Sequence, residues 1–171
     1  MKHLINLIII FSLFSQVCNA QRQRIKNIDE YKVIYDSLVY KLKTVEKDTS
    51  YFIGKPVSDF VKQIEKCGLK VITVWLSKSD NKPVEQHLYA IRLLFLTDEN
   101  FNFVRNNNMR APSIIIEFKE SQPYQQALSL FQKYGGDFEE EVEEFYSDAV
   151  IKEFEFYFPE SIHDTHARRR R

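Results

Sequence analysis

Residues 69 to 97 read LKVITVWLSKSDNKPVEQHLYAIRLLFLT, and this stretch decides the fold of the chain. From Leu69 to Leu76 the side chains alternate with a period of two, which is typical of a strand. A polar stretch from 78 to 85 predicts a loop, and a second alternating run from His87 to Thr97 follows it. The two runs therefore predict a β-hairpin.

The alternation also predicts which way the strand side chains point. The odd positions of the second run are uncharged, whereas the even positions include Arg92, so we expect the odd set to face the core. The first run separates into one side with Ile72, Val74 and Leu76 and another with Val71, Thr73 and Trp75. A slip of one residue would invert every one of these assignments.

The sequence predicts helices both before and after the hairpin. Asn27 and Glu30 have capping-box spacing before a helix of about 20 residues, and a second helix is expected from Pro56, as its first position, to the stop at Gly68. Asn106–Asn108 predicts a turn, and Ser113 to Lys119 a third strand. A helix from Pro123 ends at Gly135 and Gly136. The next helix is expected to begin with a capping pair at Asp137 and Glu140, and a last strand runs from Ala149 to Phe158.

This order predicts a single α+β domain over residues 21–159. We expect a mostly antiparallel sheet of about four strands, with helices packed on one face and an N-terminal helix. The second face is expected to be half solvated and to carry Trp75, Arg92, Glu117, Lys119, Glu153, Glu155 and Tyr157.

The first 20 residues predict an export signal. A basic start at Lys2, an apolar run from Leu4 to Phe14 and a small residue at Ala20 are its three parts. The run is shorter than the ~20 residues that span a bilayer, so no transmembrane segment is expected. We therefore expect cleavage between Ala20 and Gln21 and a periplasmic or extracellular protein. Residues 160–171 are expected to form a flexible basic tail.

The signal ends in Cys-Asn-Ala followed by Gln, in a chain rich in Ile, Lys and Asn. In these features it resembles small exported proteins of Bacteroidota. The resemblance covers the signal and the general composition. It implies export and carries no activity over to any residue.

Charge and cysteine content exclude some classes of function. The chain has 24 basic and 24 acidic residues, so no net field attracts nucleic acid. Loss of the signal would remove Cys18 and leave Cys67 as a lone thiol, without an internal disulfide. Cys67 continues the apolar side of its helix, and we expect it to be shielded.

Catalytic patterns are weak throughout the sequence. The four glycines form no phosphate-binding loop, and a Cys67–His87 dyad or a Glu153/Glu155 acid–base pair would be needed for hydrolysis. The segment His163–His166 could ligate a metal but lies in the expected tail, and the acidic run 139–144 is expected to be a solvated helix face. We expect no cofactor, no metal site and no catalysis.

Binding is the function that remains. Trp75 is the only tryptophan, and with Arg92 and Tyr157 it would make the second sheet face suitable for an envelope protein or glycan partner. The alternative for Trp75 is burial beneath the N-terminal helix. Two other functions stay open: an envelope hydrolase or inhibitor using His87/Cys67 or Glu153/Glu155, and a peripheral protein held weakly to anionic membranes by Arg168–Arg171.

Overall fold

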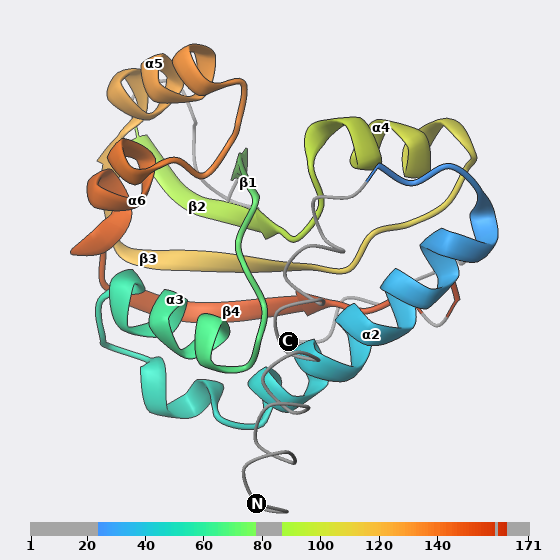
Figure 1. The fold of residues 1–171 in the computed structure, drawn as a ribbon. Helices are drawn as coiled ribbons and strands as arrows, with labels where there is room; N and C mark the ends of the chain where they lie inside the picture. The colour runs from blue at the N-terminus through green and yellow to red at the C-terminus, as the bar shows by residue number, and fades with distance from the viewer. Residues whose placement is uncertain (1–23, 78–86, 160, 164–171) are drawn as a thin grey trace, which may run out of the picture.

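The computed structural model describes residues 24–77, 87–159 and 161–163. Figure 1 shows helices gathered around a twisted sheet. In chain order the elements are α2 (Ile28–Glu46), the 3-10 helix η1 (Thr49–Phe52), α3 (Val57–Lys66), β1 (Thr73–Ser77), β2 (His87–Leu94), α4 (Asp98–Asn106), β3 (Ser113–Pro123), α5 (Tyr124–Tyr134), α6 (Glu140–Ser147) and β4 (Ile151–Tyr157).

The sheet has the order β1-β2-β3-β4, and every neighbouring pair is antiparallel. The predicted α+β class and the hairpin between the first two strands are thus confirmed. β1 begins at Thr73 rather than Leu69, and β2 ends at Leu94 rather than Thr97. β3 runs four residues past its predicted end, as far as Pro123.

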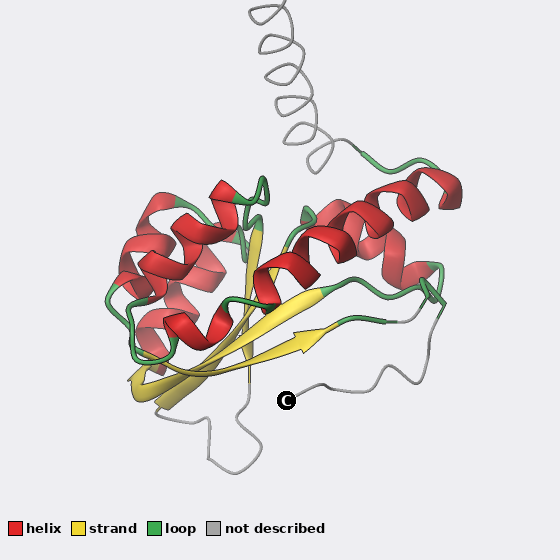
Figure 2. Ribbon diagram, turned by 90° about the horizontal axis from the view of Figure 1, so that it is seen from below, coloured by secondary structure: helices red, strands yellow, loops and turns green. Residues whose placement is uncertain are grey.

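One face of the sheet carries the core. Val74, Leu93, Ile114 and Phe156 lie opposite one another across the four strands, and all four are buried. Figure 2 shows α2 together with α3, α5 and α6 on this same side of the sheet. The strand phases predicted from the sequence are therefore correct where they matter most, in the centre of the sheet.

Helix α2 begins as its capping box predicts. The Asn27 side chain accepts a hydrogen bond from the Glu30 amide at 2.9 Å, and the Glu30 carboxylate accepts one from the Lys26 amide. Its buried face consists of Tyr31, Tyr35, Leu38, Leu42 and Val45, whereas the apolar Ile28 in its first turn is 42% exposed. The helix turns its tyrosines inward, where their hydroxyls bond to backbone carbonyls of distant segments.

The predicted capping pair at Asp137 and Glu140 is wrong. Asp137 forms a bridge with Thr73, and α6 starts later, with Glu139 at its N-cap and no side-chain capping bond there. The segment 136–138 is instead held against the outer edge of β1 by two backbone hydrogen bonds of 2.8 Å, in which the Val74 amide donates to the Gly136 carbonyl and the Phe138 amide to the Ile72 carbonyl. Pro56 is likewise the N-cap of α3 rather than its first residue.

Both outer strands receive partial cover of this kind. On β4 the covering segment is 54–57, which bonds to residues 149–151, with an isolated bridge between Pro56 and Val150. Exposed strand edges invite pairing with other chains, and short covering segments reduce that exposure.

A helix that the sequence did not predict, α4, occupies residues 98–106. The Thr97 side chain caps it by accepting a bond from the Asn100 amide. The buried Asn100 side chain then accepts a bond from the Ile25 amide at 2.8 Å, which ties α4 to the segment before α2. Figure 1 shows α4 beyond the end of β2.

Candidate functional site

The three predicted binding residues lie on one face of the sheet, opposite to the face that carries the core. Trp75 on β1 is directly across from Arg92 on β2. Tyr157 on β4 is across from Ser113, which in turn is across from Leu94, two residues after Arg92. Side chains two positions apart on a strand share a face, so the sheet brings the three together.

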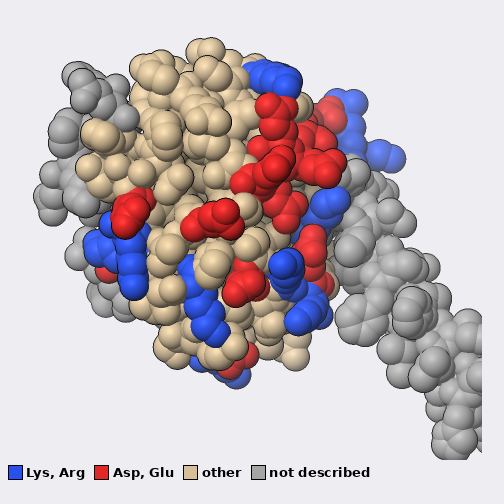
Figure 3. All heavy atoms as spheres, turned by 90° about the vertical axis from the view of Figure 1, so that its left-hand side faces the viewer, with Lys and Arg blue, Asp and Glu red and all other residues tan. Residues whose placement is uncertain are grey.

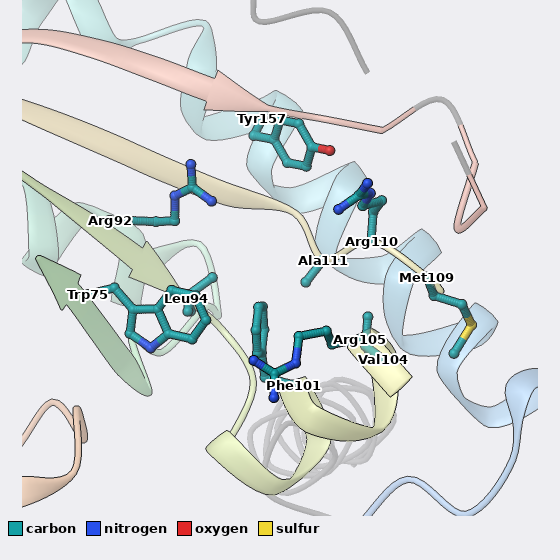
Figure 4. Close-up of a pocket in the computed structure, with 10 residues that line it drawn as sticks. All are labelled: Trp75, Arg92, Leu94, Phe101, Val104, Arg105, Met109, Arg110, Ala111 and Tyr157. Carbon is teal, nitrogen blue, oxygen red and sulfur yellow. The ribbon is translucent and has the colours of Figure 1, made fainter. Parts of the chain in front are cut away.

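Helix α4 closes one side of this group and forms a cavity with it. The cavity has a volume of about 260 Å³, and Trp75, Arg92 and Tyr157 all line it. From α4 come Phe101 and Arg105. Figure 4 shows the labelled side chains around the space between the strands and α4.

Trp75 is half-buried and packs against α4. Its ring meets the ring of Phe101 edge to face, with centroids 4.5 Å apart and an angle of 73° between the planes. Such pairs contribute ~0.5–1.5 kcal/mol beyond the area they bury. The expected cover by the N-terminal helix does not occur, because α2 lies on the other side of the sheet (Figure 2).

The turn from α4 into β3 is held in place by backbone bonds on both sides of Arg110, another lining residue. The Arg110 amide donates to the carbonyl of Ile162 at 2.8 Å, and its carbonyl accepts a bond from the Tyr31 hydroxyl. Burial, helped by the nearby Tyr35, raises the pKa of the Tyr31 hydroxyl far above its usual range, so this donor keeps its proton. The core helix therefore fixes one wall of the cavity.

The sequence did not reveal Phe101, Arg105 or Arg110 as site residues. Phe101 and Arg105 lie just before the predicted turn at Asn106–Asn108 and Arg110 lies just after it, in a stretch for which the sequence predicts neither a helix nor a strand. A signal was present, since Thr97 precedes two acidic residues and Arg105 lies in the last turn, the usual charge order of a helix.

The proposed Cys67–His87 dyad has no geometric support. His87, at the exposed start of β2, has its Nδ1 3.1 Å from the Ser121 hydroxyl, whereas Cys67 is the half-buried C-cap of α3. Within the parts of the chain that the structure describes, no hydrogen bond joins the two side chains. The expected full shielding of Cys67 is not reached, because the thiol side chain is only partly buried against the core.

Glu153 and Glu155 share the open face of β4, as predicted, but neither lines the cavity. Glu153 lies across from Glu117, whose carboxylate pairs with Lys152 at 2.9 Å and raises the pKa of that lysine. Glu155 lies across from Ile115. The arrangement is that of charged side chains on a solvated strand face.

The acidic run forms a patch at the α5–α6 end of the molecule (Figure 3). α6 buries Val142 and Tyr146 and exposes most of its glutamates. Glu141 is held by Lys133 and the Tyr134 hydroxyl, and these hydrogen bonds lower its pKa. The acidic run is therefore the solvated face of α6.

Among residues 24–77, 87–159 and 161–163, no group of three His, Cys, Asp or Glu side chains could hold a metal ion. The segment His163–His166 falls mostly outside these ranges, as do the predicted signal and Arg168–Arg171. No helix within the same ranges has the length and apolar character needed to cross a membrane. No family model, curated protein or solved structure matches this chain.

Proposed function

We propose that this protein is an exported, non-catalytic binding domain whose ligand occupies the cavity between α4 and the open sheet face. One observation carries the proposal: the predicted residues Trp75, Arg92 and Tyr157 line a common cavity, which α4 completes with Phe101 and Arg105. A cavity with an aromatic wall and a few convergent polar groups is a typical binding site.

The contrast with the catalytic candidates supports binding rather than turnover. His87, Cys67 and the carboxylates of β4 all lie outside the lining of this cavity. A general base must come within hydrogen-bond reach of the proton that it removes. The lining instead offers guanidinium groups, a phenol and an indole, which suit recognition.

The proposal is tested with a chemically broad fragment library. Trp75 is the only tryptophan, so its emission reports on this cavity without a label. We expect some compounds to change Trp75 emission saturably and to raise the melting temperature. Two variants should abolish that stabilisation: Trp75→Ala, which removes a wall, and Ala111→Phe, which fills the space.

Tyr40→Ala is the matched control, because Tyr40 is an aromatic side chain 75% exposed on α2, away from the cavity. It should leave binding unchanged. Since Trp75 is only half-buried, Trp75→Ala should cost less than the ~3–5 kcal/mol typical of a core aromatic. Hits that survive both cavity variants would contradict the proposal. Hydrolase turnover that disappears in His87→Ala or Glu153→Gln would also contradict it.

A further inference from the structure

The cavity at Trp75 carries a concentrated positive charge. Arg92 comes from β2, Arg105 from α4 and Arg110 from the turn before β3, and Figure 4 shows their guanidinium groups on different sides of the same space. None of the described residues that line the cavity is acidic. Three cations therefore face one cavity of about 260 Å³.

The carboxylates of α4 do not neutralise Arg105 or Arg110. The two acidic residues of α4 are engaged elsewhere, because Asp98 accepts a bond from Asn102 and Glu99 pairs with Arg24 at 3.0 Å. Arg105 donates to the neutral Asn102 side chain at 3.0 Å. Among the described residues, neither Arg105 nor Arg110 forms an ion pair with a carboxylate. Arg92 lies in the same register row as Glu155 and has an interaction of its own within the protein, so the free positive charge of the cavity comes from Arg105 and Arg110.

Beside the charge, the cavity has an apolar wall. The Trp75 and Phe101 rings form its aromatic part, and Leu94, Val104 and Met109, all buried, also line it. A wholly hydrated anion would leave this wall in contact with water. A ligand that carries both an apolar ring and a negative group would satisfy both halves.

We propose that the cavity binds an aromatic oxyanion, meaning a small molecule with one planar ring and a carboxylate or phosphate group. The ring would lie against Trp75 and Phe101, and the oxyanion beside Arg105 and Arg110, within reach of the Tyr157 hydroxyl. Planar guanidinium groups match both carboxylate and phosphate oxygens with paired hydrogen bonds. The volume lies below the ~300–1,000 Å³ of pockets for drug-sized ligands, which suits a molecule of a single ring. This inference rests on the proposed function, since it assigns a ligand class to the same cavity.

Four probes separate the two requirements, with Trp75 emission and calorimetry as readouts. Phenyl phosphate and 3-phenylpropionate carry both the ring and the anion, whereas inorganic phosphate lacks the ring and benzyl alcohol lacks the charge. We expect at least one of the first pair to bind about tenfold or more tightly than either of the last two. The preferred member of the pair then distinguishes phosphate from carboxylate. Added salt should weaken the aromatic anion and leave benzyl alcohol unaffected.

Arginine variants assign the effect to the cavity. Arg105 and Arg110 are exposed, so Arg105→Gln and Arg110→Gln should fold, and each should weaken the preferred anion about fivefold to tenfold. Lys62→Gln, on the exposed side of α3, makes the same change in net charge away from the cavity and should have no effect.

The outcomes also separate this inference from the proposed function. The oxyanion assignment would be wrong if benzyl alcohol bound as tightly as the aromatic anions, or if the arginine variants bound those anions normally. The proposed function would survive either result, because the cavity could still bind a ligand of another class. If none of the four probes binds and no library compound responds to Ala111→Phe, both proposals fail.

Discussion

Tyr31 connects the core to the candidate site through a single hydroxyl group. The side chain is fully buried on α2, and its hydroxyl donates to the carbonyl of Arg110 at the cavity wall. Removing the donor would leave a carbonyl short of a partner at a cost of ~1–3 kcal/mol. A residue far from the cavity in sequence thus helps to fix the backbone of one of its three arginines.

Burial of Tyr31 also makes stability depend on alkaline pH. Its pKa is raised in the folded state, so the unfolded chain releases this proton first, near pH 10. The free energy of unfolding is therefore complete below about pH 10 and falls above it, by up to ~1.4 kcal/mol per pH unit for each such tyrosine. Tyr146, whose pKa burial raises in the same way, contributes a second share.

We predict that Tyr31→Phe flattens this alkaline decline while lowering stability at neutral pH by ~1–3 kcal/mol. Urea unfolding between pH 8 and about pH 11 measures both effects. The control is Tyr40→Phe, since Tyr40 is 75% exposed and should change neither quantity. An alkaline slope that is the same in Tyr31→Phe and in the unmodified protein would show that this hydroxyl does not control the decline.

At the scale of elements, the strands could be predicted from sequence and α4 could not. Alternation in a strand determines which side chains share a face, so the common placement of Trp75, Arg92 and Tyr157 followed from strand phases alone. α4 lacks a regular apolar period, and only Asn100 and Val104 in it are buried. Its position depends on the Asn100–Ile25 bond, a contact across 75 residues that no local pattern contains. Three of the six aromatic and arginine residues that line the cavity, Phe101, Arg105 and Arg110, could therefore not be predicted from the sequence.

The connection between α5 and α6 offers a matched pair of glycines. Gly135 ends α5 with φ of 63°, and a Cβ there would meet nothing within 4 Å. Gly136 has φ of 92°, and a Cβ there would lie 3.0 Å from the Phe131 ring and 3.4 Å from the Val74 carbonyl. Gly136 also accepts the bond from Val74 that covers the edge of β1.

We predict that Gly135→Ala costs ~1–2 kcal/mol, the strain of a left-handed backbone alone. Gly136→Ala should cost ~2–4 kcal/mol, because the Phe131 ring must also move by a few tenths of an ångström to admit the new Cβ. Urea unfolding curves give both values. Equal losses would mean that the segment beside β1 moves away freely, and that its pairing contributes little to the sheet.

At the scale of the whole molecule, the helices are distributed unevenly over the sheet. α2, α3, α5 and α6 cover one face (Figures 1 and 2). On the opposite face, α4 packs beside Trp75, and charged pairs such as Glu117 with Lys152 are found farther along the sheet. The cavity lies between α4 and the strands of this face. This face is only partly buried around Trp75, Arg92 and Tyr157, so a ligand could occupy the cavity without disturbing the core on the other face.

The last prediction concerns the thiol that would remain after cleavage of the proposed signal. If the signal is cleaved after Ala20 as we propose, Cys18 is lost and Cys67 remains the only cysteine. No internal disulfide could then form, and the apolar core must supply the stability that disulfides supply in many secreted proteins. We therefore expect an intact mass corresponding to residues 21–171, and the same free energy of unfolding with and without reductant. The control is Cys67→Ser, which should remove all labelling by thiol reagents in denaturant. A retained N-terminus, a lipid on Cys18, or stability lost on reduction would each contradict this account.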